Sequence, residues 1–141
     1  MNQDFKKLTV EAIVAAEPAK VWESWTKPEH IVKWNFASDD WCCPKAESEL
    51  KAGGNYKARM EAKDGSFGFD FEGIFGEVVQ EKKIVLTLGD GRSAATTFEN
   101  VAGKTKVTTV FDAEKLNPEQ MQKDGWQAIL NNFKKYVESK P

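Results

Sequence analysis

The chain of 141 residues is poor in the side chains that most metal and acid–base chemistry requires. Its single histidine, His30, could supply only one member of a histidine-based metal site or a Ser-His-Asp triad. Its two cysteines, Cys42 and Cys43, are adjacent, and neighbouring residues rarely meet disulfide geometry. No second cysteine pair stands at zinc spacing. We therefore predict no metal site, no cofactor and no disulfide framework.

Motifs that cradle phosphates or activate a nucleophile are also missing. The sequence has no GxxxxGK[ST], no GxGxxG after a strand and no GxSxG. His30 lies in the short amphipathic segment PEHIVKW, which favours a solvent-facing or capping role. Asp39 and Asp40 are adjacent carboxylates in a predicted loop, a placement typical of solvated side chains. We therefore predict no catalytic residue.

Long hydrophobic runs and an excess of one charge are absent as well. The nearest apolar run is the five-residue AIVAA at 12–16, whereas a membrane span needs about 18 apolar residues. Twenty basic residues oppose twenty-two acidic ones, so the formal charge is −2. This balance lacks the basic excess expected of a general nucleic-acid binder. We predict no membrane span, no nucleic-acid partner and, without a secretion signal or disulfides, a cytoplasmic location.

What the chain does contain is apolar and aromatic side chains at regular spacing. Hydrophobic residues make up 40% of the chain and aromatic residues 11%, which argues against intrinsic disorder. No repeat or Pro/Gly-rich linker divides it, so we predict a single domain over 1–141. Residues 5–16 alternate as a half-buried strand would. Pro18 and Pro28 then favour the beginnings of two short helices.

Hairpin signals dominate the middle of the chain, from about residue 47 to residue 112. Runs of alternating apolar and polar residues are separated by turn sequences at 53–54, 64–65, 90–91 and 103. The two Asp-Gly dipeptides predict turns in which both central residues have positive φ. The pattern indicates six successive antiparallel strands that form a curved meander with one apolar face.

The last segment has the pattern of a long amphipathic helix. We expect Asn117 to cap it and Pro118 to occupy its first position. One apolar stripe follows, formed by Trp126, Ile129, Leu130, Phe133 and Val137. The stripe needs an apolar partner, and the aromatic face of the sheet is the only one available. Gly125 either allows close approach to that sheet or leaves room above it.

The predicted fold class is α+β: a curved antiparallel sheet, built from one strand, two short helices and a six-strand meander, wraps around the long C-terminal helix. Core packing accounts for most of the aromatic residues, but a strongly curved sheet around one helix also leaves an apolar gap suited to a small ligand. Tyr56, Thr97 and Thr109 could supply polar contacts there. The predicted ligand-binding residues are Trp34, Phe36, Trp41, Tyr56, Met60, Phe69, Phe71, Phe98, Thr109, Trp126, Leu130 and Phe133.

Four phrases of the sequence carry a family resemblance. They are PAKVWESWTKPEHIVKW at 18–34, the Gly-Gly start of a strand at 53–54, FEGIFGEVVQEKKIVLT at 71–87 and GWQAILNNFKKYV at 125–137. With the order of elements, they resemble the helix-grip fold of the START/SRPBCC (Bet v-like) superfamily, and in particular homologues of the activator of heat-shock-protein-90 ATPase. The resemblance implies a cavity that holds hydrophobic small molecules, lipids or polyketides, and in some members cyclase or hydrolase activity. It also implies a stress-response setting.

Three functions follow from this reading. The first is non-enzymatic binding of a hydrophobic small molecule or lipid between the C-terminal helix and the sheet. The alternative is a co-chaperone-like module that stimulates the ATPase of a heat-shock chaperone, although the chain has only one of that co-chaperone's two domains. The second alternative is a small hydrolase or cyclase that uses pocket carboxylates and Tyr56, with Asp39 and Asp40 as the only loop candidates.

Overall fold

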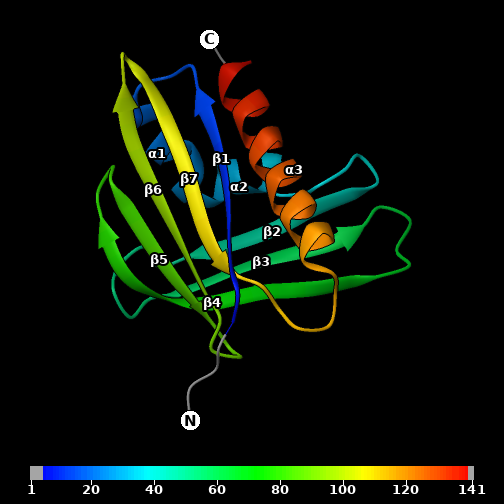
Figure 1. Cartoon of the computed structure of the whole chain (residues 1–141). Coiled ribbons are helices and arrows are strands. Elements are labelled where there is room, and N and C mark those ends of the chain that lie inside the picture. The colour runs from blue at the N-terminus through cyan, green and yellow to red at the C-terminus, as the bar shows by residue number, and fades with distance from the viewer. Residues whose placement is uncertain (1–4, 140–141) are drawn as a thin grey trace.

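The computed structural model describes residues 5–139; positions 1–4 and 140–141 of the predicted domain lie outside the described residues. One strand, two short helices and six further strands precede a long final helix (Figure 1). In chain order the elements are β1 (Lys7–Val14), α1 (Pro18–Thr26), α2 (Pro28–Trp34), β2 (Trp41–Ser48), β3 (Asn55–Ala62), β4 (Gly68–Val79), β5 (Lys83–Leu88), β6 (Ser93–Val101), β7 (Lys104–Asp112) and α3 (Glu119–Glu138).

The strands form one antiparallel sheet in the order β1-β7-β6-β5-β4-β3-β2. Strands β2 to β7 pair with their sequence neighbours, and β1 pairs with β7 from Lys7 opposite Asp112 to Val14 opposite Thr105. Figure 1 shows that the sheet bends strongly, so β2, β3 and β4 run across the direction of β1, β6 and β7. This confirms the predicted α+β helix-grip architecture.

Helix α3 lies along the concave side of the sheet (Figure 1). Its apolar stripe behaves as predicted: Leu130, Phe133 and Val137 are buried, and Trp126 and Ile129 are half-buried. Proline begins α1 and α2 as expected, and neither helix has a side-chain cap. Together the helices and the inner face of the sheet enclose the hydrophobic core.

The beginning of α3 differs from the prediction. The helix starts at Glu119, with Pro118 rather than Asn117 in the N-cap position, and no side chain caps it. Asn117 is instead held by Glu114, whose carboxylate accepts hydrogen bonds from the Asn117 backbone and side-chain amides. Because Glu114 already binds this residue in the preceding loop, Asn117 does not cap the helix.

The first strand of the meander also differs, since β2 begins at Trp41 rather than near residue 47. Its pairing with β3 is irregular between Cys42 and Lys45, where Pro44 has no N–H to donate. The irregularity changes which residues of β2 face inward. Cys43 faces the core, and after the irregularity the inward-facing residues are Ala46 and Ser48 rather than Lys45 and Glu47. A strict period of two would have sent Ser48 to the outer face.

The hairpin turns differ in their backbone conformation. In the two Asp-Gly turns only the glycines, Gly65 and Gly91, have positive φ. The Asp64 and Asp90 carboxylates accept hydrogen bonds from the amides two residues later, as in Asx turns. The turn with two consecutive positive φ angles is Ala102-Gly103, at 54° and 84°. The positions of these turns follow the prediction, while two of the expected conformations were wrong.

Candidate functional site

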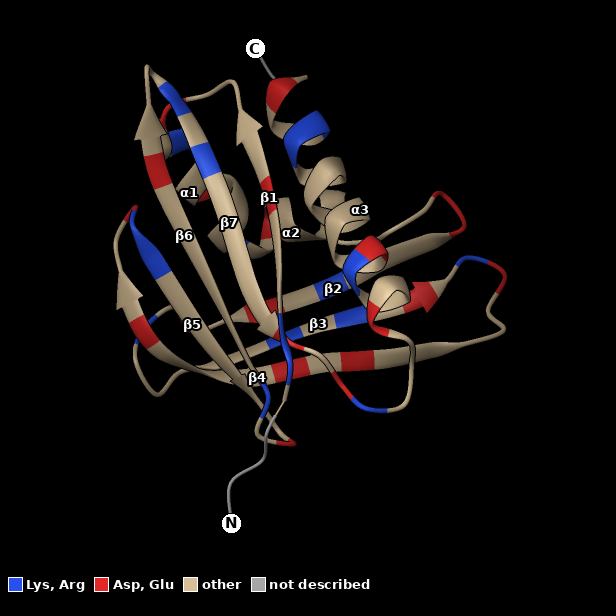
Figure 2. Ribbon diagram, viewed as in Figure 1, with Lys and Arg blue, Asp and Glu red and all other residues tan. Residues whose placement is uncertain are grey.

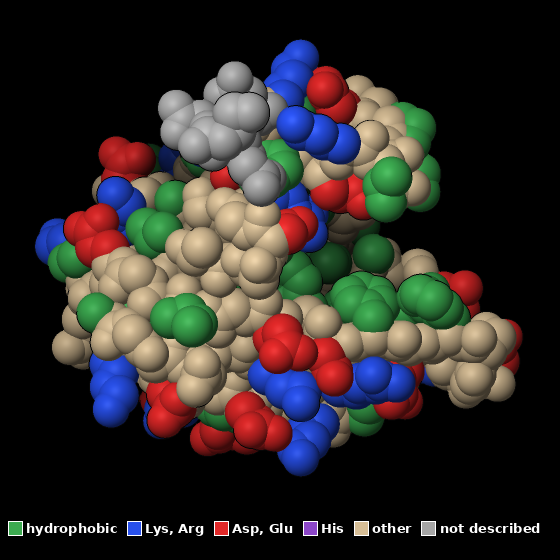
Figure 3. Space-filling model, turned by 90° about the horizontal axis from the view of Figure 1, so that it is seen from below, with side chains coloured by type: hydrophobic (Ala, Val, Ile, Leu, Met, Phe, Trp, Pro, Cys, Tyr) green, Lys and Arg blue, Asp and Glu red, His purple; other side chains and the backbone are tan. Residues whose placement is uncertain are grey.

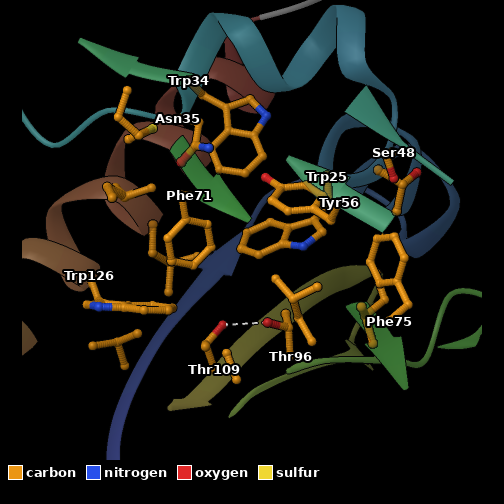
Figure 4. Close-up of a pocket in the computed structure, with 18 of the residues that line it drawn as sticks. Trp25, Trp34, Asn35, Ser48, Tyr56, Phe71, Phe75, Thr96, Thr109 and Trp126 are labelled. Carbon is orange, nitrogen blue, oxygen red and sulfur yellow. Dashed lines mark hydrogen bonds between the residues drawn. The ribbon is translucent and has the colours of Figure 1, made fainter. Parts of the chain in front are cut away.

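A cavity of about 240 Å³ lies between α3, the two short helices and the bent sheet. Trp126, Ile129 and Leu130 of α3 form one side, and Trp25, Thr26, Trp34 and Asn35 of the short-helix region form another (Figure 4). The floor comes from the inner face of the sheet, with Val10, Ile84, Leu86 and Ala94 among its residues.

Aromatic rings position the wall residues by packing against one another. Trp126 stacks on Phe111 of β7, with ring centroids 4.1 Å apart and planes 7° apart, and its edge meets Phe71 of β4. On the other side Trp25 stacks on Trp34, with centroids 4.9 Å apart. Buried rings have few alternative rotamers in close-packed surroundings, so these contacts hold the walls apart and keep their shape.

Two threonine hydroxyls on the floor satisfy each other. Thr96 of β6 and Thr109 of β7 are directly paired across the strands, and their Oγ1 atoms are 2.8 Å apart (Figure 4). Both residues are buried, at 5% and 3% exposure. On the helix side the Thr26 hydroxyl donates to the backbone carbonyl of Trp22. These hydroxyls are therefore committed to partners within the protein.

The wall formed by β2 and β3 carries two further hydroxyls, those of Ser48 and Tyr56. Tyr56 lies between Phe71 and Phe75, which it meets edge to face, and its hydroxyl points into the cavity (Figure 4). No residue that the structure describes forms a hydrogen bond with the Tyr56 hydroxyl. The Ser48 hydroxyl is buried, and within 5–139 it too has no partner.

No charged side chain lines the cavity among the described residues. Burial raises the pKa of the Tyr56 phenol well above its ordinary value, with a smaller effect from Cys43, so this group stays neutral at physiological pH. Burial likewise raises the pKa of the Cys43 thiol to about 11. The charged residues of β3 and β4 alternate with uncharged residues along the two strands (Figure 2), and none of them lines the cavity.

On the outer face of these strands the charged side chains pair with one another. Asp70 of β4 lies 3.6 Å from Arg59 and 3.8 Å from Lys57, both on β3, and Arg59 also contacts Glu61 at 2.8 Å. The same strands thus present opposite chemistry on their two faces. Alternation along β3, and along β4 as far as Phe75, produces this separation, as the sequence pattern predicted; after Phe75 the pairing of β4 with β5 is irregular.

Eight of the twelve predicted site residues line the cavity. They are Trp34, Tyr56, Met60, Phe69, Phe71, Thr109, Trp126 and Leu130. Phe98 and Phe133 do not reach it, because Trp25 lies against both, with centroid distances of 5.9 Å and 4.9 Å. These two residues are core residues behind the wall rather than part of it.

Phe36 and Trp41 also lie outside the cavity. Phe36 lines a separate shallow groove between the loop after α2 and the outer side of α3. Trp41 packs against Phe67 and Phe69, with centroids 5.9 Å and 6.2 Å away. Phe67 is 60% exposed and Phe69 42% exposed, so Phe67 lies outside the layer between α3 and the sheet. We call Trp41, Phe67 and Phe69 the exposed aromatic cluster.

Several residues of the cavity wall were not predicted from the sequence. Thr97 faces outward, and its neighbour Thr96 takes the predicted polar position, because the inward phase of β6 is Ala94, Thr96 and Phe98. Trp25 of α1 and Asn35, which follows the last helical residue of α2, also line the cavity, and neither was among the predicted site residues. The alternation of Ala94, Thr96 and Phe98 along β6 could have predicted that Thr96 faces inward. No sequence pattern predicts that Asn35, which lies just after α2, faces the cavity.

The remaining chemical candidates lie away from the cavity. His30 is half-buried rather than solvent-facing, and its Nδ1 lies 2.7 Å from the hydroxyl of Tyr136 on α3. Asp39 and Asp40 are exposed in the loop before β2. Within 5–139 no group of three or more His, Cys, Asp or Glu side chains could hold a metal ion. No helix among the same residues is long and apolar enough to cross a membrane.

The cavity is not fully enclosed, because two of its lining residues are exposed: Phe69 near the β3–β4 turn and Leu50 in the β2–β3 turn. Seen from below, the surface is hollowed by a cleft with hydrophobic side chains along its floor and one side (Figure 3). The cavity residues most exposed to solvent are Phe69 and Leu50, at 42% and 36%. A ligand would therefore pass apolar side chains on its way in.

A bent antiparallel sheet that encloses an apolar cavity against a C-terminal helix defines a helix-grip protein of the START/SRPBCC type. The sequence profile described as "Activator of Hsp90 ATPase homolog 1-like protein" matches residues 15–138. The chain therefore belongs to this family. No match to the chain was found among curated proteins.

Solved structures agree with this assignment. An AHSA1-like protein from Aeromonas hydrophila is 40% identical, with a TM-score of 0.90 over 95% of this chain and 93% of its own. A protein from Cytophaga hutchinsonii is 46% identical, with a TM-score of 0.82 over 94% and 92%. A protein from Chromobacterium violaceum, 21% identical over 94% and 98%, shares the fold with a TM-score of 0.85.

Proposed function

We propose that this protein binds a small hydrophobic molecule or lipid in the cavity between α3 and the sheet, without catalysing its conversion. The observation that carries the proposal is an aromatic-walled cavity of about 240 Å³ with no charged residue among its described lining residues. Such a site suits binding because apolar burial contributes about 25 cal/mol per Å². A hydrolase or cyclase would instead need an acid or base at the reacting atoms.

The volume sets the size of the ligand. Sites for drug-sized molecules usually measure about 300–1,000 Å³. At about 240 Å³ this cavity favours a compact molecule, such as a small fused-ring aromatic, or the end of a longer chain that projects through the opening.

The tryptophans offer a direct test. Trp25, Trp34 and Trp126 line the cavity, whereas Trp22 and Trp41 do not. In ¹⁵N-labelled protein titrated with naphthalene, we expect the indole N–H signals of the first three to shift in a saturable manner. The signals of Trp22 and Trp41 should stay nearly fixed and serve as internal controls. Binding outside the cavity would move Trp41 alone, and either that result or no shift at all would overturn the proposal.

A matched pair of variants on β6 separates cavity binding from surface binding. Ala94 faces the cavity and Ala95 faces outward on the neighbouring position. Ala94→Leu should weaken naphthalene binding at least tenfold, while Ala95→Leu leaves it unchanged. Because overpacking can cost about 1–3 kcal/mol, urea unfolding of both variants comes first, and Ile129→Trp fills the cavity from the helix side as a second test.

A second candidate function is a co-chaperone-like interaction, which two observations favour. The family description names an activator of an Hsp90 ATPase, and the exposed aromatic cluster offers an apolar surface that a protein partner could cover. The test is the ATPase rate of a purified Hsp90-type chaperone with and without this protein. Stimulation that Phe67→Ser abolishes would support this function, and an unchanged rate at saturating protein would exclude it for that chaperone.

A further inference from the structure

The hydroxyl groups around the cavity fall into two classes. Those of Thr96 and Thr109 on the floor bond to each other at 2.8 Å, and that of Thr26 donates to a backbone carbonyl. The hydroxyls of Tyr56 and Ser48 have no such partner among the residues that the structure describes. Of the two, only the Ser48 hydroxyl is a fully buried atom, and a buried polar group without a hydrogen bond costs free energy. The Tyr56 hydroxyl is less completely enclosed, so a polar ligand atom in the cavity can reach it and form the hydrogen bond that the protein does not supply.

Both unsatisfied hydroxyls belong to one wall. Ser48 of β2 is paired directly with Tyr56 of β3, and both side chains face inward. Ser48 reaches this wall only because the irregularity after Cys42 shifts the alternation of β2. The Tyr56 hydroxyl extends further into the cavity, toward Trp25, Trp34 and Phe71 (Figure 4). This wall therefore forms one polar end of the cavity, and the other polar lining residues are Thr26, Asn35, Thr96 and Thr109.

Given the binding role above, we propose that the ligand is an uncharged apolar molecule with a hydroxyl or carbonyl group that hydrogen-bonds to the Tyr56 hydroxyl. The Ser48 hydroxyl supplies the second polar contact after rotation about its Cα–Cβ bond. Tyr56 is thus the specificity-determining residue of the cavity. A neutral phenol both donates and accepts, so either ligand group satisfies it.

The absence of charge among the described lining residues excludes an ionised ligand group inside the cavity. A carboxylate, phosphate or ammonium buried there would lose its hydration and find no opposite charge, which costs far more than burying a hydroxyl. A free fatty acid could therefore bind only with its carboxylate outside the opening. Lys57 and Arg59, the cations nearest in sequence to Tyr56, point to the outer face, where they pair with Asp70.

The test uses three probes of one shape: naphthalene, 2-naphthol and 2-naphthoate. Dissociation constants come from the indole N–H shifts of Trp25, Trp34 and Trp126 at pH 7. We expect 2-naphthol to bind at least fivefold more tightly than naphthalene, and 2-naphthoate to bind at least tenfold more weakly than 2-naphthol. In Tyr56→Phe the preference for 2-naphthol over naphthalene should fall to about one, with naphthalene binding unchanged.

The second tyrosine of the chain provides the matched control. Tyr136 lies on α3 and contacts His30 rather than the cavity. Tyr136→Phe removes the same atom and should keep the preference for 2-naphthol. Ser48→Ala should reduce that preference in part. Urea unfolding of each variant establishes that it is folded under the conditions of the titration.

The outcomes separate the two proposals. If naphthalene shifts the cavity indoles but 2-naphthol binds no better, or keeps its advantage in Tyr56→Phe, the polar contact with Tyr56 is overturned and cavity binding stands. Binding of 2-naphthoate as tight as that of 2-naphthol would overturn the requirement for an uncharged ligand. If none of the three probes binds, the proposed function itself is overturned.

Discussion

The threonine pair on the cavity floor can be tested by a double-mutant cycle. Thr96 and Thr109 lie opposite each other on β6 and β7, and their hydroxyls form a buried hydrogen bond of 2.8 Å. Valine has nearly the shape of threonine, with a methyl group in place of the hydroxyl. Thr96→Val, Thr109→Val and the double variant therefore change the hydrogen bond while they leave the packing nearly constant.

The expected magnitudes follow from burial. Each single variant leaves the remaining hydroxyl without its partner in an apolar site, which should lower the free energy of unfolding by about 1–3 kcal/mol. The double variant removes both groups and should lie within about 1 kcal/mol of the wild type, because replacing both partners by apolar groups is nearly neutral. The coupling energy, which is the sum of the two single losses minus the loss of the double variant, should therefore be roughly 1–6 kcal/mol.

The assay is urea unfolding followed by tryptophan fluorescence, with an unchanged slope on urea as the condition for comparing midpoints. Strictly additive effects, with the double variant as unstable as the sum of the singles, would refute the argument. That result would mean that each hydroxyl bonds separately to water in the cavity. Losses below about 0.5 kcal/mol in both singles would lead to the same conclusion.

Three further predictions concern stability. Asp112 is buried, which opposes ionisation, yet hydrogen bonds from Lys7 and Ser93 hold the pKa of its carboxyl below the ordinary value. Its stabilisation is therefore present above about pH 4 and is lost as the pH falls through the folded-state pKa. Asp112→Asn should cost about 1.5–3 kcal/mol at pH 6 and little near pH 2, and an equal loss at both values in urea unfolding would contradict this. Gly125→Ala should raise the urea midpoint by a stabilisation of about 1 kcal/mol, because a Cβ there meets nothing within 4 Å; a lower midpoint would show a hidden contact. Ala102→Gly should relieve the positive φ of 54° and stabilise by up to about 1 kcal/mol in the same assay, and an unchanged midpoint would show that the turn is unstrained.

Most of the fold could be predicted because its signals are local. Alternation along β3 separates Tyr56 and Met60 from Lys57 and Arg59, and the helical spacing of Trp126, Leu130 and Phe133 requires an apolar partner. The beginning of β2 was missed because Pro44 and a pairing irregularity interrupt its period. The cap of α3 was missed because Glu114, three residues earlier, binds Asn117 first.

The residues of the candidate site were harder to predict than the fold. When two inward-facing side chains lie one behind the other, only the one nearer the cavity lines it, and the sequence does not show which one that is. Phe98 and Trp25 are both aromatic and both face the core, but only Trp25 reaches the cavity, since it covers Phe98. Ser48 faces the cavity because of the irregularity in the pairing of β2, and Thr96 faces it because Ala94, Thr96 and Phe98 point inward on β6. The spacing of residues in the sequence predicts which face of a strand or helix a side chain occupies. It does not predict whether that side chain reaches the cavity or is covered by another residue.

The pairing of β1 with β7 has a consequence for biosynthesis. Lys7 and Asp112, which join the two strands by an ion pair, are 105 residues apart in the sequence. Strands β2 to β6 can pair with their neighbours as they leave the ribosome, but β1 must wait for β7 before its edge is covered. Closing so long a loop is entropically costly and slow. Because Val10 of β1 and Trp126 of α3 both line the cavity, its walls cannot be complete until α3 has been synthesised.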